Sequence, residues 1–187
     1  MIRILIADDH AIVRAGLKQF ISDQPDMQVA GEAATGSEAI ALVRASEFDV
    51  VLLDISMPDK NGIDTLKTLK QVRPELPILM LSGYAEDQYA VNLLRAGASG
   101  YLNKEAASTQ LVGAIRTVVR GRKFVSPALA QILADGVTGD ADRPLHGELS
   151  QREFQIFCKL SAGAAVSKIA DELHLSVKTV STYRTRV

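Results

Sequence analysis

The sequence of 187 residues lacks tryptophan, has a single cysteine and contains no long hydrophobic run. The lone cysteine, Cys158, excludes an internal disulfide and suits a reducing compartment. A helix that spans a bilayer needs roughly 20 apolar residues in a row, and no segment approaches that length. The first residues, MIRILIADDH, lack the cleavage pattern of a signal peptide. We therefore expect a soluble protein of the cytoplasm, without membrane partners.

Neither sign of charge predominates, since the formal net charge is −1. Residues 1–121 carry a net charge of −3, whereas residues 148–187 carry +2. An acidic body with a mildly basic end indicates that only the C-terminal part meets an anionic partner. Because +2 is also common on an ordinary solvated surface, this charge pattern needs support from the motifs.

Short apolar runs alternate with helical patterns through the first 121 residues. The predicted strands are 2–7, 27–33, 49–53, 77–82 and 99–102, and the predicted helices are 11–22, 36–46, 62–72, 86–97 and 108–121. The strands are continuously apolar, which is typical of strands buried on both faces. The pattern predicts an α/β fold with a doubly wound, five-stranded parallel sheet. In the first helix we expect one apolar stripe, formed by Ile12, Val13, Gly16, Leu17, Phe20 and Ile21.

Composition changes over residues 122–147. The segment SPALAQILA is consistent with a short helix that has Ser126 as its cap and Pro127 at its first position. The following DGVTGDADRPLHG is rich in glycine, aspartate and proline, and we interpret it as a flexible linker. The chain is therefore expected to contain two domains.

A second, small all-α domain is predicted over residues 148–187. Ser150 and Glu153 form a capping-box pattern before an apolar helical face of Phe154, Ile156, Phe157 and Leu160. Two short helices follow, at 166–174 and 177–187, joined by a tight turn at Leu175–Ser176. Such a pair is typical of a helix-turn-helix, whose second helix normally enters the major groove of DNA.

The last helix has two different stripes. We expect Val177, Val180 and Val187 to face the core of the small domain. The opposite stripe is expected to meet the major groove, with two arginines beside it toward phosphates: Lys178, Ser181, Thr182 and Thr185, flanked by Arg184 and Arg186. The alternative is that this stripe is only the solvated face of a surface helix, and the tight turn before the helix favours DNA binding.

Polar residues follow the apolar strands of the first domain, where parallel α/β sheets bind ligands. Asp8 and Asp9 end the first strand, Asp54 the third and Ser82 the fourth, and Lys104 lies just past the fifth. Three carboxylates in one pocket are costly to ionise together unless a cation lies among them, and Mg²⁺ prefers oxygen ligands. A carboxylate beside a metal, an ammonium and a hydroxyl can attack a phosphoryl group. The pattern predicts that Asp54 is phosphorylated.

Each of these residues also has an ordinary interpretation when taken alone. Asp8 and Asp9 could simply precede the positive end of a helix. Lys104 could be a solvated lysine and Ser82 a turn residue. His10 is interpreted as structural, because an oxygen-ligand magnesium site does not need an imidazole. Their combination at matching strand ends favours the phosphorylation site.

The motifs ADDH, LLDISMPDKNG, LSGY and GASGYLNKE resemble the receiver domain of two-component response regulators, which has a flavodoxin-like fold. LSQREFQIF and IADELHLSVKTVSTYR resemble the LuxR-type DNA-binding domain of the NarL/FixJ class. The resemblance covers nearly all of the chain except the linker. It implies a receiver domain over 1–121, a linker over 122–147 and a helix-turn-helix domain over 148–187.

The resemblance implies that a sensor histidine kinase phosphorylates Asp54 and that the protein then dimerises and binds double-stranded DNA as a transcription regulator. Mg²⁺ would be the cofactor. Asp9, Asp54 and the carbonyl of Ser56 would bind it directly, and Asp8 would act through water. These roles are what the resemblance implies.

Three more receiver residues are implied to respond to the phosphoryl group. Ser82 would bond to it, Lys104 would pair with it, and Tyr101 would change rotamer. Tyr101 could instead be an ordinary half-buried aromatic of a strand. Many receivers have proline after the lysine, where this chain has Glu105, and we expect little effect from that departure.

Two other function classes compete with this interpretation. Phosphatases with an aspartyl-phosphate intermediate use a second aspartate, two positions after the nucleophile, as an acid/base. This chain has Ser56 at that position. We therefore expect no enzyme activity beyond uptake and slow loss of its own phosphoryl group. A pure interaction switch without DNA binding is the other alternative. It stays open because the sequence stops at Val187 within an uncapped helix, which suggests a shortened form of a longer protein.

Overall fold

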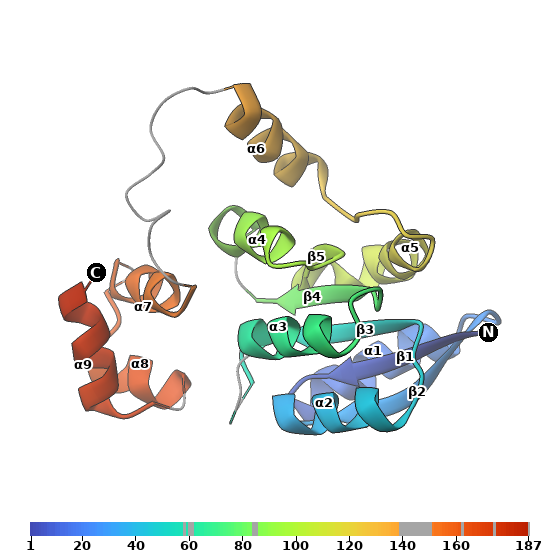
Figure 1. Cartoon of the computed structure of the whole chain (residues 1–187), viewed down its shortest axis with the longest axis horizontal. Helices are drawn as coiled ribbons and strands as arrows, with labels where there is room; N and C mark the ends of the chain where they lie inside the picture. Colours follow the sequence, from blue (N-terminus) through green and yellow to red (C-terminus); the bar gives the residue numbers. More distant parts are fainter. Residues whose placement is uncertain are drawn as a thin grey trace. The chain divides into compact units, whose positions relative to one another are not determined.

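The computed structural model describes residues 1–57, 59, 62–83, 86–138, 151–161, 163–173 and 175–186. These form two compact units, Met1–Leu133 and Ala134–Val187, and each unit is considered by itself (Figure 1). No helix in the described part of the chain is both long enough and apolar enough to cross a membrane.

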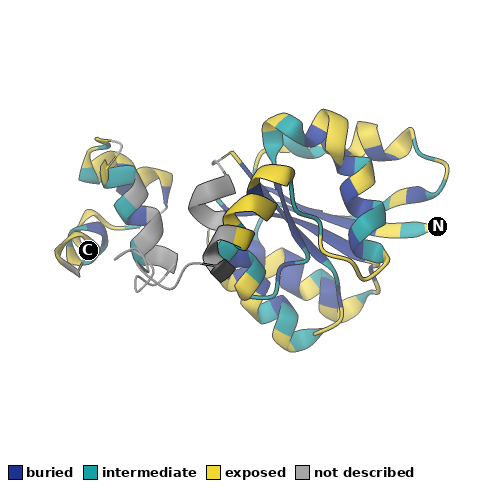
Figure 2. Cartoon of the chain, turned by 90° about the horizontal axis from the view of Figure 1, so that it is seen from above, coloured by how far each residue is buried: buried dark blue, intermediate teal, exposed yellow. Residues whose placement is uncertain are grey.

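The first unit is built on the predicted five-stranded parallel sheet. Its strands are β1 (Ile2–Ala7), β2 (Met27–Ala33), β3 (Val50–Asp54), β4 (Ile78–Ser82) and β5 (Gly100–Asn103). Their order in the sheet is β2-β1-β3-β4-β5, and all pairs are parallel. Figure 2 shows these strands as a buried layer between helices. The predicted α/β fold class is confirmed, because continuously apolar strands need cover on both faces.

The helices follow the predicted alternation. They are α1 (Ala11–Ser22), α2 (Gly36–Ala45), α3 (Gly62–Val72), α4 (Glu86–Arg95), α5 (Ala107–Val119), α6 (Pro127–Thr138), α7 (Gln151–Ser161), α8 (Val166–Glu172) and α9 (Val177–Arg186), with a 3-10 turn at Lys104–Ala106. Thr35 caps α2, because its side chain accepts a hydrogen bond from Glu38 N over 3.1 Å. Ser126 caps α6 as predicted, and its hydroxyl oxygen accepts from Leu129 N over 3.1 Å.

Helix α1 buries only part of its predicted apolar stripe. Leu17 and Ile21 are buried, whereas Ile12 is 85% exposed and Phe20 is 37% exposed. Residues 12, 16 and 20 form one row of the helix and residues 13, 17 and 21 the next, and the second row faces the sheet. The expectation of a single buried stripe was therefore wrong for Ile12 and Phe20.

Helices α1 and α5 share one apolar core with the sheet, which joins residues from Ile4 to Val118. At its edge Arg116 of α5 makes a two-point ion pair with Asp26, with distances of 2.8 Å and 3.1 Å. The Arg116 side chain also donates to Gln24 Oε1. The last helix of this core is thus tied to the loop before β2.

The chain beyond α5 continues along the edge of the sheet. Phe124 forms a parallel β-bridge with Gly100, and Phe124 N donates to Ser99 O over 2.9 Å. A Cβ at Gly100 would lie 2.8 Å from the backbone oxygen of Phe124, so this pairing requires glycine. The first compact unit therefore extends past residue 121. The predicted flexible linker was wrong for residues 135–138, which belong to α6, and its remainder, 139–147, lies outside the described residues. The domain boundaries stay a prediction.

The second unit is the predicted small helical domain. Its core contains Ile156, Ile169, Ala170, Leu173 and Val180, all buried. The prediction for Val177 was wrong: it is 52% exposed, because it lies at the first position of α9, and Tyr183 packs against the core instead. Expectations for Ser150, Val187 and the side chains of Phe154 and Cys158 lie outside the described part.

Candidate functional site

The two central strands of the sheet bring the predicted acidic residues together. Asp8 directly follows β1 and Asp54 ends β3, and these strands are paired in register, with Ala7 opposite Leu53. From β1 the chain continues to β2 on one side, while β3 lies on the other, so this edge is the topological switch point of the sheet. Asp8 is 0% exposed and Asp54 is 2% exposed.

Lys104 completes the pocket from the turn after β5. Its ammonium lies 2.7 Å from Asp8 Oδ2 and 2.9 Å from Asp54 Oδ1. The predicted convergence of Asp8, Asp54 and Lys104 is therefore present. One ammonium faces two buried carboxylates, which leaves a negative charge uncompensated by these three groups.

The electrostatics of the pocket follow from this imbalance. Burial raises the pKa of Asp54 to about 6, and the nearby Asp8 carboxylate adds to the rise while Lys104 opposes it. Burial by itself would lower the pKa of Lys104, but the attraction of Asp54 and Asp8 outweighs it and the pKa is raised. A cation placed among the carboxylates would hold Asp54 ionised near neutral pH.

The loop after Asp54 is held by backbone contacts. Ser56 N donates to Asp54 Oδ2 over 3.2 Å, and Gly62 N donates to Ile55 O over 2.9 Å. A Cβ at Gly62 would lie only 1.9 Å from the Asp54 carbonyl oxygen. Helix α3 therefore begins against the backbone of Asp54, and only glycine allows that approach.

The donor set fits a divalent cation. Asp8, Asp9, His10 and Asp54 each offer one ligand atom, and these atoms lie within 4.8 Å of one another. Asp8 Oδ2 and Asp9 Oδ1 are buried and, in the described part of the chain, have no partner with hydrogen-bond geometry, although Lys104 and His10 lie near them. Carboxylate oxygens of this kind are the ligands that Mg²⁺ prefers.

Ser82 and Tyr101 are placed by the registers of β3 with β4 and of β4 with β5, in which Tyr101 is opposite Met80. Asp54 is paired with Leu81, so Ser82 lies one position beyond the level of Asp54. Ser82 is 1% exposed, and Tyr101 is 0% exposed. Tyr101 is therefore fully buried in β5 rather than half-buried.

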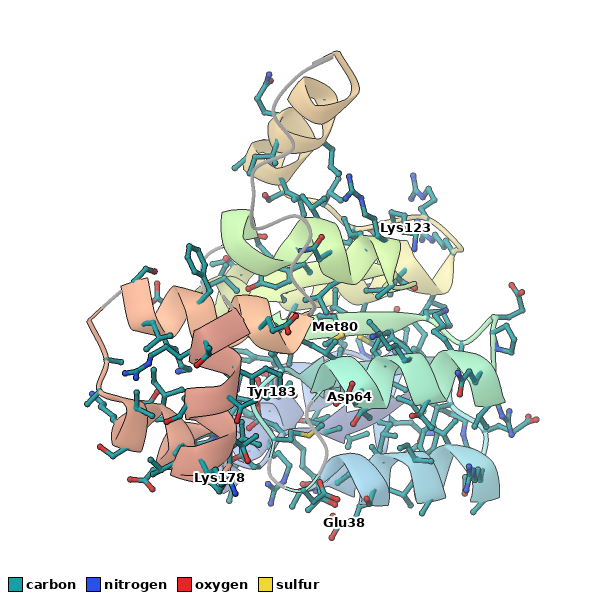
Figure 3. The ribbon with its side chains drawn as sticks, turned by 60° about the vertical axis from the view of Figure 1, so that its left-hand side comes forward. Glu38, Asp64, Met80, Lys123, Lys178 and Tyr183 are labelled. Carbon is teal, nitrogen blue, oxygen red and sulfur yellow. The ribbon has the colours of Figure 1, made fainter. Side chains whose placement is uncertain are left out.

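Helix α9 presents the predicted polar stripe in the second unit. Its N-terminus is capped by Ser176, whose Oγ accepts a hydrogen bond from Thr179 N over 3.0 Å. The side chains of Lys178, Thr182, Arg184 and Thr185 are exposed and Ser181 is half-buried, whereas that of Arg186 lies outside the described part. Figure 3 labels Lys178 and the core residue Tyr183 on this helix. The stripe is therefore accessible to a partner.

Two threonine hydroxyls of α9 are already engaged as donors. Thr182 Oγ1 donates to Lys178 O over 3.0 Å, and Thr185 Oγ1 donates to Ser181 O over 3.1 Å. Each oxygen can still accept a hydrogen bond, and each methyl group can contact the methyl of thymine. Donation to the carbonyl oxygen four positions earlier is a common arrangement for threonine within a helix.

Known families match both parts of the chain. The response regulator receiver domain matches residues 4–116, and the luxR family of bacterial regulatory proteins matches residues 147–187. Response regulator UvrY of Escherichia coli K12 is 36% identical over 188 residues, covering all of this chain and 86% of that protein. Response regulator GacA of Pseudomonas aeruginosa is 37% identical over 189 residues, covering all of this chain and 88% of that protein.

Solved structures agree with these matches. A two-component response regulator of the LuxR family from Aurantimonas has a TM-score of 0.68 and 34% identity, covering 73% of this chain and 98% of that one. RcsB of Salmonella enterica serovar Typhimurium, bound to the promoter rprA with a phosphomimetic, has a TM-score of 0.69 and 26% identity, covering 100% of this chain and 90% of that one.

Proposed function

Since the chain belongs to the two-component response regulators that join a receiver domain to a LuxR-type DNA-binding domain, we propose that phosphorylation of Asp54 controls its binding to DNA. It is a DNA-binding transcription regulator of two-component signalling. The observation that carries the proposal is the position of Asp54, a buried carboxylate at the switch point of the sheet, 2.9 Å from the Lys104 ammonium.

Asp54 acts as the nucleophile. One of its carboxylate oxygens forms a bond to the phosphorus of a phosphohistidine on a sensor kinase, the P–N bond of the donor breaks, and the released imidazole takes up a proton. The Lys104 ammonium then pairs with the phosphoryl oxygens. Ser56 N, which already donates to Asp54 Oδ2, helps to orient the carboxylate.

Asp9, Asp54 and the carbonyl oxygen of Ser56 would hold Mg²⁺ directly, with Asp8 acting through water. The ion supplies positive charge to the transferring oxygens when it is bound. Support for this site comes from the converging carboxylates and from the buried oxygens of Asp8 and Asp9 that lack hydrogen-bond geometry.

Ser82 and Tyr101 connect the phosphoryl group to the receiver surface. Ser82 donates to a phosphoryl oxygen when its loop moves inward, and Tyr101 rotates into the space that this movement leaves. The surface of α4, β5 and α5 then changes shape and favours a homodimer. The nearly complete burial of both side chains supports a coupled movement, because a packed interior accommodates a shift by discrete rearrangement.

Helix α9 reads double-stranded DNA. Base edges meet the stripe of Lys178, Ser181, Thr182 and Thr185, and phosphates meet Arg184 and Arg186. Short hydroxyl side chains read few base positions, so a homodimer on paired half-sites is needed for affinity. RcsB, whose solved structures include dimers bound to DNA, supports this arrangement.

The protein works as a switch of the cytoplasm rather than as an enzyme. Its catalysis is limited to uptake and slow loss of its own phosphoryl group, because Ser56 stands two positions after Asp54, where a phosphatase needs an acid/base carboxyl. A sensor histidine kinase is the phosphoryl donor in the cell.

Intact mass spectrometry after incubation with Mg²⁺ and acetyl phosphate tests this function. Wild type gains one acid-stable, base-labile phosphoryl group. Asp54→Asn gains none, and a chelator blocks the uptake. Asp49→Asn, at the opposite end of the same strand region, is the matched control and is phosphorylated like wild type. Equal uptake by Asp54→Asn contradicts the assignment.

A further inference from the structure

The side chain of His10 lies at the acidic pocket, whereas its carbonyl oxygen accepts hydrogen bonds from Val13 N and Arg14 N in the first turn of α1. It is the N-cap residue of α1, yet its side chain makes no capping hydrogen bond. Its Nδ1 atom instead lies 2.7 Å from Asp9 Oδ1 and 3.4 Å from Asp8 Oδ1. The imidazole is thus directed at the two carboxylates that precede the helix.

The spacing of these atoms suits coordination of a metal ion. Neighbouring ligands of an octahedral ion with bonds of about 2.1 Å are about 3 Å apart. The two distances from Nδ1 lie on either side of that value. Asp54 belongs to the same set, in which all ligand atoms are within 4.8 Å of one another. Asp8 Oδ2 lies 2.7 Å from the Lys104 ammonium, so the contacts of His10 are to the other oxygen of Asp8 and to Asp9.

We propose that His10 contributes Nδ1 as a ligand to the divalent ion of this pocket and shifts the pocket's selectivity from Mg²⁺ toward Mn²⁺ and Co²⁺. The inference rests on the metal position of the proposed function. Its chemical reason is that imidazole suits transition metals, whereas Mg²⁺ selects oxygen ligands. The His10 side chain is 61% exposed, so water can solvate Nε2–H in the neutral tautomer that binds through Nδ1.

The competing explanation is that Nδ1–H donates a hydrogen bond to Asp9 and only orients that carboxylate. In that case His10 is a positioning residue, and its loss weakens Mg²⁺ and Co²⁺ binding alike. A nitrogen ligand has a different signature, because the nitrogen couples magnetically to a bound paramagnetic ion.

Pulsed electron paramagnetic resonance of the full chain with Mn²⁺ tests the ligand directly. We expect nitrogen modulation that changes when the protein carries ¹⁵N-histidine and that disappears in His10→Ala. Because the side chain caps nothing, His10→Ala keeps the start of α1, which circular dichroism and thermal unfolding verify. Absence of histidine nitrogen coupling in wild type overturns the proposal.

Metal affinities measured by displacement of Mn²⁺ provide the second test. We expect His10→Ala to bind Co²⁺ about tenfold more weakly, with Mg²⁺ affinity changed less than about twofold. Equal losses for both ions, or no loss, overturn the proposal. Asp54→Asn serves as the reference for the pocket, and it should weaken the binding of both Mg²⁺ and Co²⁺. If Asp54→Asn leaves both affinities unchanged, the metal position of the proposed function fails, and this inference fails with it.

Discussion

The Lys104 ammonium lies 2.9 Å from Asp54 Oδ1, so the proposed nucleophile is paired with a cation that lies 50 positions later in the sequence. The same ammonium contacts Asp8 Oδ2. Two carboxylates that are at most 2% exposed therefore share this ammonium. The stability of the receiver is therefore linked to the groups for which we propose a role in phosphoryl transfer.

Loss of Lys104 should destabilise the receiver. In Lys104→Met the two buried carboxylates lose their counter-charge, and we expect the free energy of unfolding to fall by about 3 kcal/mol at pH 7.5 with chelator present. Urea unfolding measures the loss. Lys18→Met is the matched control, because it removes a more exposed ion pair with Glu32 and should cost less than about 1 kcal/mol. Equal losses in the two variants would contradict the prediction.

Asp54→Asn should stabilise the metal-free protein in a pH-dependent way. Folding raises the pKa of Asp54 from 3.8 to about 6 through burial, so its ionisation costs the folded state stability as the pH rises. We expect a gain of up to about 3 kcal/mol above pH 6 that disappears as the pH falls toward 4. Urea unfolding across this range with chelator is the measurement. A gain that does not vary with pH, or an equal effect of the exposed Asp171→Asn, argues against the assignment.

Gly62→Ala should damage both the fold and the phosphorylation site. Its Cβ would meet the Asp54 carbonyl oxygen at 1.9 Å, so either α3 or the Asp54 backbone must move. We expect a loss of more than about 2 kcal/mol in urea unfolding and slower phosphoryl uptake. Gly113→Ala in α5 is the control, because nothing lies within 4 Å of its added Cβ. It should gain about 0.5–1 kcal/mol, since alanine favours a helix interior.

Substitutions in α9 should separate base reading from phosphate contact. Thr182→Val keeps the methyl group but removes a hydroxyl oxygen that can accept from a base, so we expect altered sequence preference. Arg184→Ala should weaken binding to all sequences alike and reduce the dependence on salt. Fluorescence anisotropy with a panel of DNA sites at two salt concentrations compares them. The same pattern of loss in both variants would count against α9 as the reading helix.

Ser82→Ala should separate phosphorylation from its output. We expect the variant to accept a phosphoryl group at Asp54 but to dimerise much less in response, because the inward hydrogen bond is missing. Sedimentation with beryllofluoride as the phosphoryl mimic measures dimerisation, and Ser82→Thr, which keeps the hydroxyl, is the control. If Ser82→Ala dimerises as readily as wild type, Ser82 is not the relay.

The sequence was sufficient to predict the sheet and the members of the acidic pocket. Continuous apolar runs mark strands that are buried on both faces, and each predicted strand lies within one residue of the observed one. Polar residues after such strands must converge at one edge when the strands are parallel. Asp8, Asp54 and Lys104 therefore meet as predicted.

Helix faces and close backbone contacts were less accessible to prediction. Ile12 and Val177 are apolar and correctly spaced, yet both are exposed, because their depth depends on where neighbouring elements end. The role of Tyr183 in the core of the small domain was missed, although Tyr183 lies three positions after Val180 and therefore on the same helical stripe. The contact of Gly62 with Asp54 depends on loop geometry that spacing does not encode.

The ion pair between Arg116 and Asp26 joins residues 90 positions apart, across the core that α1 and α5 share. Until α5 has left the ribosome, the apolar core that it shares with α1 and the sheet is incomplete. Such long-range closure is slow and exposes apolar surface until it is complete. The receiver is therefore expected to complete its core only after its last helix has emerged from the ribosome.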